Sequence, residues 1–209
     1  MKLNMTLSRF GSFSDGVFAI AITLLALDIK VPELEQATPA SAIVEMVQVW
    51  PYFLSYVTSF LVIGVIWLNH HTLFHFLKSI DRTTLTINLL LLMCVAFIPY
   101  STKLISEYGQ LQPVVMFYGL SLALTGVVYN WLWFYVVRKY LRSHPKINSQ
   151  FIRQASIWSI GYPLLYLMAT ILSLVTISGS IVLYVLIPLF YLLPSKIDQQ
   201  LLDLIDETT

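Results

Sequence analysis

Charged residues are scarce in this chain. Lys, Arg, Asp and Glu make up 11% of its 209 residues, whereas hydrophobic residues make up 57% and the mean hydropathy is +0.76. Soluble domains carry about 25% charged residues, so the composition excludes a soluble globular protein and indicates an integral membrane protein. A lipid bilayer is therefore an expected partner, and nucleic acid is not.

Cysteine is almost absent. Cys94 is the single cysteine and lies inside an apolar run, so an intramolecular disulfide is excluded and no redox compartment can be inferred. We interpret this side chain as a small apolar group that is buried or faces lipid.

Sequence motifs of common enzymes and common channels are missing as well. There is no GxSxG, no P-loop, no glycine-rich nucleotide fingerprint and no HExxH, so we expect no enzyme, no cofactor and no resident metal. A TVGYG-like filter loop and an Arg-rich sensor helix are also absent, which excludes the usual gated channels.

Apolar runs separated by polar breaks predict an all-α membrane protein of six transmembrane helices, forming one domain over residues 1–209. Of the 12 Lys and Arg residues, only Lys30 and Lys103 would lie outside if both termini are cytoplasmic, as the positive-inside rule favours. A tail from about residue 196 is predicted to be a short cytoplasmic helix or a frayed end. The helices are expected at residues 13–29, 41–68, 85–104, 113–137, 155–177 and 180–193.

The first apolar run is unusually short. Only residues 16–27 separate Asp15 from Asp28, and at 1.5 Å per residue they reach about 18 Å, less than the ~30 Å hydrocarbon core. Such a helix suits the middle of a bundle better than a lipid-facing position. We expect it to be retained rather than cleaved as a signal peptide, because Asp28, Lys30 and Pro32 follow it instead of a small-x-small site.

One face of this first helix carries Ile20, Thr23, Leu24 and Leu27, which follow helical spacing. Two interpretations remain open from the spacing. The stripe packs against neighbouring helices, which is the commoner outcome, or it lines a pore that gates by constriction and dewetting. In the second case Thr23 would add a ring of hydroxyl groups within the apolar stack.

Polar side chains gather near one end of the first three helices. Asp15 can cap the first helix, with Arg9 folding back onto it or reaching another helix. His71 and His75 stand at i, i+4 and can share a helix face, but a zinc site needs a third ligand, so network or interfacial histidines are expected and a metal site is the alternative. Asp81 and Asn88 are candidate hydrogen-bond partners for the first helix.

Several short motifs carry a family resemblance: Arg9-x-x-x-Phe13-Ser14-Asp15, Ala19-Ile20-x-x-Thr23-x-x-x-Leu27, Trp67-x-x-His70-His71, Asn88 and Phe97-Ile98-Pro99. They resemble the endolysosomal potassium channel family and its bacterial relatives, whose first helix carries an Arg-x-x-x-Phe-Ser-Asp signature. The resemblance implies a channel for K⁺ and other monovalent cations, assembled as a homotetramer in the bacterial inner membrane, with the first helix at the centre.

The resemblance also implies roles for single residues. Ile20, Leu24 and Leu27 would form a hydrophobic pore constriction, and Thr23 a polar ring that influences a weak to moderate preference for K⁺ over Na⁺. A network on the cytoplasmic side would comprise Arg9, Phe13, Ser14, Asp15, Trp67, His70, His71 and Asn88.

Two other classes of protein remain as alternatives. A secondary transporter would place an ionisable residue in the middle of a helix, and none of the predicted spans contains one. A membrane scaffold protein would conduct no ions.

Overall fold

The computed structural model describes residues 7–31, 43, 46–75, 77, 79–141 and 149–193. Within these ranges every regular element is helical, in agreement with the predicted all-α fold. The predicted start of the second helix at residue 41 and the predicted tail helix beyond residue 196 lie outside the described residues.

The structure describes six α-helices and one π-helical turn. Five of them are long and apolar enough to cross a membrane. The last helix has 16 residues and reaches about 24 Å, so the sixth predicted span stays a prediction. The helices are α1 (Leu7–Leu27), α3 (Trp50–His75), α4 (Arg82–Tyr108), α5 (Gln112–Val136), α6 (Ser149–Leu172) and α7 (Ile177–Leu192), with the π-helical turn η1 (Val137–Leu141) after α5.

Several predicted boundaries are wrong. Helix α1 begins at Leu7 rather than residue 13, because the side chain of Phe10 is buried against Phe74 of α3. Asp15 therefore lies inside the helix and is not its cap. Helix α6 begins earlier and ends earlier than predicted, and α7 begins at Ile177, where the Thr176 hydroxyl accepts a hydrogen bond from the Gly179 amide at 3.2 Å.

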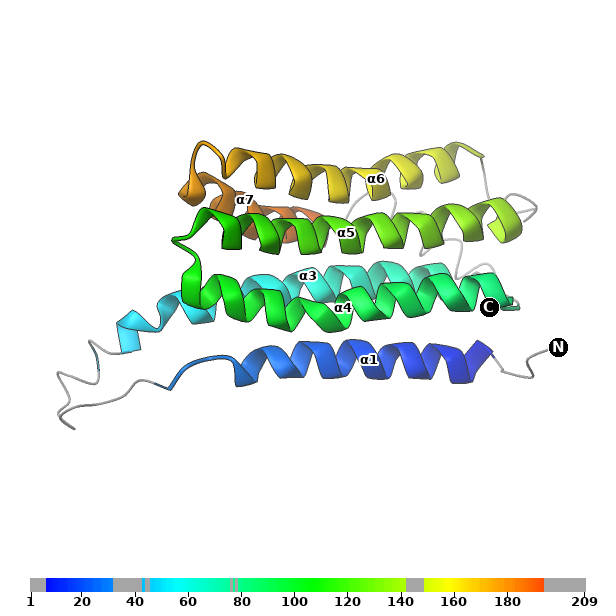
Figure 1. Ribbon diagram of the computed structural model, residues 1–209. Helices are drawn as coiled ribbons and strands as arrows, with labels where there is room; N and C mark the ends of the chain where they lie inside the picture. Colours follow the sequence, from blue (N-terminus) through cyan, green and yellow to red (C-terminus); the bar gives the residue numbers. More distant parts are fainter. Residues whose placement is uncertain are drawn as a thin grey trace.

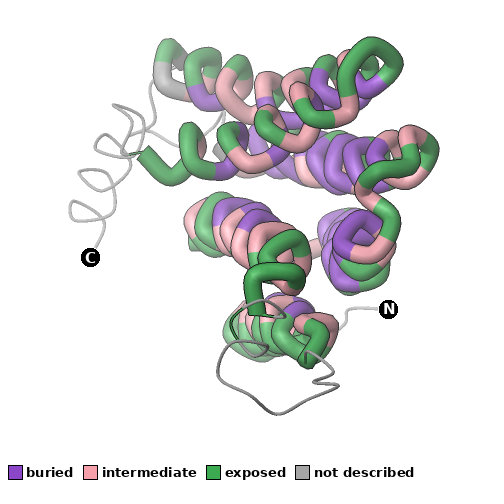
Figure 2. Tube along the Cα trace, turned by 90° about the vertical axis from the view of Figure 1, so that its left-hand side faces the viewer, coloured by how far each residue is buried: buried purple, intermediate pink, exposed green. Residues whose placement is uncertain are grey.

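The helices lie roughly parallel or antiparallel in layers (Figure 1). Helix α5 packs against α4 on one side and α6 on the other, while α3 bridges α4 and α7. Helix α1 packs mainly on α3 and α4 among the described elements and lies at one edge of the subunit, where much of its surface is exposed (Figure 2). Helix α1 is thus peripheral in the single subunit, and its predicted central place in a homotetramer stays a prediction.

Close helix contact around α5 depends on glycine. A Cβ atom at Gly119 would lie 2.1 Å from the hydroxyl oxygens of both Thr170 in α6 and Tyr184 in α7, and one at Gly126 would lie 2.8 Å from the ring of Tyr162. Small residues let membrane helices approach closely without help from the hydrophobic effect. Gly119 therefore fixes the junction at which α5, α6 and α7 meet.

Gly119→Ala is expected to destabilise the subunit. Overpacking costs about 1–3 kcal/mol, and each kcal/mol lowers the melting temperature by about 2–4 °C in a chain of this size. Thermal unfolding in detergent measures the effect. The control is Gly64→Ala in α3, where nothing lies within 4 Å of the added Cβ and alanine favours the helix. Equal melting temperatures for Gly119→Ala and the unmodified chain would contradict this account.

Candidate functional site

Helix α1 has two chemically distinct faces. The face towards α3 and α4 buries Phe10, Ser14, Phe18, Ala21 and Leu25. The opposite face leaves the predicted stripe uncovered, with 60% of Ile20, 43% of Leu24 and 79% of Leu27 exposed. The described helices of the subunit therefore leave this stripe uncovered, and it is available to lipid, to a neighbouring molecule or to an aqueous path.

Thr23 lies on the same uncovered face. Its hydroxyl donates to the backbone carbonyl oxygens of Ala19 at 3.0 Å and Ile20 at 2.9 Å. Because the proton points back to the helix, the oxygen lone pairs face outward. Thr23 can thus present an acceptor to a water molecule or a cation.

A buried hydrogen-bond network joins α1 to α3 and α4. Asn88 Nδ2 donates to Ser14 Oγ at 3.0 Å, and Asn88 Oδ1 lies 2.7 Å from His70 Nε2. The Asn88 oxygen can only accept, so His70 Nε2 carries the proton. Ser14 Oγ in turn donates to the Phe10 carbonyl oxygen at 3.2 Å. All three network side chains are almost fully buried, so each lost contact leaves an unsatisfied polar group.

A second polar contact lies beside this network. The indole nitrogen of Trp67 donates to Asp15 Oδ1 at 2.9 Å, and the Trp67 ring lies 5.5 Å from the His71 ring. The Asp15 carboxylate is therefore held by α3. Together the two contacts set the rotation of α1 about its axis, which decides which of its faces points away from the subunit.

Not every residue predicted for this network is in it. Phe13 and Arg9 are exposed on the outer side of α1, and Arg9 forms no ion pair with any residue that the structure describes.

The sequence analysis missed an aromatic cluster that packs around His70. The His70 ring stacks on Phe74 at 4.2 Å between centroids, lies 5.3 Å from Phe18, and Phe10 lies 5.4 Å from Phe74. The positions could have been found, because Phe10 and Phe18 stand four residues before and after Ser14, and Phe74 stands four residues after His70.

Asp81 does not join Ser14 or Asp15, contrary to prediction. It caps α4 by accepting from the Thr84 amide at 3.0 Å and also accepts from Tyr135 and Lys139. Partial burial raises the pKa of Asp81, but hydrogen bonds from Lys139, Thr84 and Tyr135 outweigh it and hold the pKa below its usual range. Asp81 therefore ties α4 to α5.

The alternative hypothesis, a metal site at His71 and His75, would need a third protein ligand. Within the described ranges there is no group of three His, Cys, Asp or Glu side chains that could hold a metal ion. The geometry supports a hydrogen-bonded network that positions α1.

Comparison with known proteins places these residues in context. The family model described as "Endosomal/lysosomal potassium channel TMEM175" matches residues 9–99, the part of the chain that holds nearly all of α1, the network and most of α4. A potassium channel from Streptomyces collinus is 38% identical over 164 residues, covering 75% of this chain and 79% of the relative. One from a Chryseobacterium species is 32% identical over 195 residues, covering 92% and 95%.

A solved structure is similar as well. The crystal structure of a Chamaesiphon minutus homolog of the lysosomal potassium-selective channel TMEM175 has a TM-score of 0.79 at 31% sequence identity. The similarity covers 88% of this chain and 95% of that one.

Proposed function

Because the chain belongs to the family of the endosomal/lysosomal potassium channel TMEM175, we propose that it is a potassium channel whose ion path is lined by the uncovered face of α1. The observation that carries this proposal is that Ile20, Thr23, Leu24 and Leu27 face away from their own subunit although all but Thr23 are apolar. Lipid can cover an apolar stripe, but only residues 16–27 lie between Asp15 and Asp28, too few to cross the ~30 Å hydrocarbon core. Together with the family membership, this favours copies of the same stripe as its cover.

Closed fourfold assembly would bring these stripes together on a common axis. Ile20, Leu24 and Leu27 would then form successive apolar rings, which oppose ion flow by excluding water when the passage is narrow. Thr23 would insert one ring of outward-facing oxygen atoms among them. A polar ring next to apolar rings supports partial discrimination between K⁺ and Na⁺.

The network then acts on the ion path through the position of α1. Ser14 and Asp15 bind α1 to α3 and α4 in the N-terminal half of the helix, and the constriction residues follow towards its C-terminal end. By the positive-inside rule the network end is cytoplasmic, and the channel would lie in a bacterial inner membrane.

The experiment is a K⁺ flux assay with the protein reconstituted in liposomes, repeated with Na⁺, together with native mass measurement. We expect K⁺ flux that exceeds Na⁺ flux modestly, from an assembly of four copies. A scaffold protein would give no flux, and a monomeric or twofold assembly would exclude the proposed path.

A secondary transporter is the alternative that one observation favours. Because α1 begins earlier than predicted, the ionisable Asp15 lies inside a candidate span. A transporter would couple K⁺ movement to a second ion, so its flux would vanish without a proton or Na⁺ gradient. A channel conducts K⁺ down its own gradient alone.

Thr23→Val is expected to lower the ratio of K⁺ to Na⁺ flux. Valine keeps the shape but removes the oxygen, and a lost difference of about 0.5–1 kcal/mol between the two ions corresponds to a roughly two- to fivefold change in the ratio. The control is Thr86→Val in α4, which removes an exposed hydroxyl that likewise bonds its own helix, at 3.0 Å. An unchanged ratio in Thr23→Val would exclude Thr23 from ion discrimination.

A further inference from the structure

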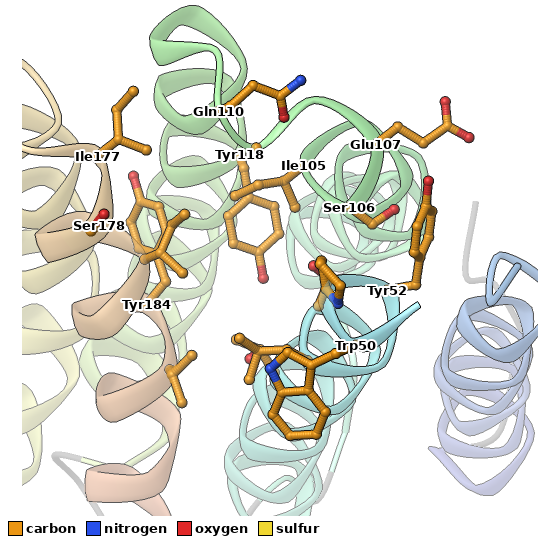
Figure 3. A pocket seen from close by; sticks show the side chains of 17 residues that line it. Trp50, Tyr52, Ile105, Ser106, Glu107, Gln110, Tyr118, Ile177, Ser178 and Tyr184 are labelled. Atoms are coloured by element: carbon orange, nitrogen blue, oxygen red, sulfur yellow. The ribbon is translucent and has the colours of Figure 1, made fainter. Parts of the chain in front are cut away.

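A cavity of about 540 Å³ opens between α3, α4, α5 and α7 (Figure 3). It lies at the start of α3 and the end of α4, whereas the network lies at the end of α3 and the start of α4. Its walls come from the start of α3 and α7, the end of α4 and the first turns of α5. Cavities of roughly 300–1,000 Å³ that are mostly apolar with a few polar groups are typical small-molecule sites. The dimensions of this cavity fit that class.

The walls combine aliphatic, aromatic and hydroxyl groups. Trp50 and Ile177 lie on opposite sides, and Tyr118 projects between them (Figure 3). The Tyr118 hydroxyl is already satisfied, since it shares a hydrogen bond of 2.9 Å with Ser59. The interior therefore offers aromatic and aliphatic contact area but few unpaired polar atoms, which suits an apolar chain or ring.

The rim of the cavity is more polar than its interior, because two of its residues contact the ammonium group of Lys30. Tyr52 and Glu107 lie next to each other there (Figure 3). The ammonium of Lys30, from just beyond α1, lies 3.6 Å from the Glu107 carboxylate and 5.0 Å from the centroid of the Tyr52 ring. An ion pair and a cation–π contact therefore act on one alkylammonium group.

These contacts hold an exposed side chain. Lys30 is 54% exposed, and first Tyr52 and then Glu107 raise its pKa above its ordinary value. Since exposed ion pairs are weak and are readily exchanged, a second ammonium group can replace Lys30 at the same rim.

We propose that this cavity binds an organic ammonium ion that carries an apolar tail. The ammonium group takes the place of Lys30 between Tyr52 and Glu107, and the tail enters the cavity between Trp50 and Ile177. Anions are disfavoured, because the carboxylate of Glu107 is the charged side chain in the cavity lining. Binding releases Lys30 and with it one of the ties between the end of α1 and α4.

The experiment measures the binding of hexylammonium to the protein in nanodiscs by titration calorimetry, with empty nanodiscs subtracted and neutral hexanol as the matched probe. We expect hexylammonium to bind more tightly than hexanol, and the ratio to reach roughly tenfold in Lys30→Gln, where no lysine competes for the two charged contacts that hexanol cannot make. Equal binding of the two probes would overturn the proposal, since it would indicate an apolar cavity without an ammonium site.

Three variants locate the site. Glu107→Gln is expected to weaken hexylammonium binding roughly three- to tenfold. Asp28→Asn is the matched control, because Asp28 and Glu107 are 25% and 23% exposed and each pairs with a lysine at 3.6 Å, but Asp28 is not in the cavity lining. Equal losses in these two variants would overturn the proposal.

Lys30→Gln should instead strengthen hexylammonium binding, because it removes the internal competitor, and a misfolded variant could not mimic that gain. Unchanged or weaker binding in Lys30→Gln would also contradict the site. The binding measurement does not depend on the proposed function, whereas a change in K⁺ flux on binding would rest on it.

Discussion

Ile20→Asn is expected to raise K⁺ flux through reconstituted protein by about tenfold or more. In the proposed assembly four Ile20 side chains form one apolar ring, and a polar side chain at that ring keeps water in the constriction and lowers the barrier to a hydrated ion. Lowering the barrier by about 1.4 kcal/mol is sufficient for a tenfold change in rate. Liposome K⁺ flux, normalised to the amount of tetramer, measures the effect.

The matched control is Ile171→Asn. Ile171 is 63% exposed, close to the 60% of Ile20, but it belongs to α6, on the far side of the subunit from α1 (Figure 1). Both variants place the same polar group on an uncovered apolar surface. Flux that rises equally in both variants would indicate a leak from disturbed packing, and unchanged flux in Ile20→Asn with intact tetramers would exclude Ile20 from the path.

Asn88→Leu is expected to have the largest effect on stability. The substitution leaves His70 Nε2 without its acceptor and Ser14 without its donor in a fully buried setting. Each unsatisfied buried group costs about 1–3 kcal/mol, so the melting temperature is expected to fall by at least about 5 °C. Because the network sets the rotation of α1, we also expect a smaller fraction of tetramer. Thermal unfolding and native mass measurement in the same detergent report the two effects.

Asn69→Leu provides the comparison for Asn88→Leu. The amide of Asn69 donates to the Val65 carbonyl oxygen of its own helix at 2.8 Å, and Asn69 is exposed. Its loss removes a local hydrogen bond without separating two helices, so little change in melting temperature is expected. If the two variants had the same melting temperature, the network would contribute nothing to the junction of α1, α3 and α4.

The sequence predicted the existence of the helices better than their ends. Long apolar runs are visible to a hydropathy argument, because lipid demands them. The start of α1 at Leu7 was not predictable in this way, since it depends on the contact of Phe10 with Phe74 across a large separation in sequence. Pro99 and Pro163 lie inside α4 and α6 without ending them, as neighbouring helices allow in membrane proteins.

The candidate site was predictable in part. Helical spacing placed Ile20, Leu24 and Leu27 on one face, but it could not say whether that face is covered. The structure answers this for one subunit, because Phe18 and Leu25 occupy the face towards α3 and α4. The partners of Ser14 followed from the resemblance and not from spacing, because Asn88 is 74 residues away in sequence.

The central claim is that the uncovered face of α1 lines the ion path. It is tested most directly by introducing one cysteine at a time along α1 in a Cys94→Ala background, and measuring inhibition of K⁺ flux by a water-soluble cationic thiol reagent. The account predicts inhibition for Ile20→Cys, Leu24→Cys and Leu27→Cys, and none for Ala21→Cys and Leu25→Cys, whose positions face α3 and α4. Inhibition at the second pair of positions, with none at the first three, would contradict it.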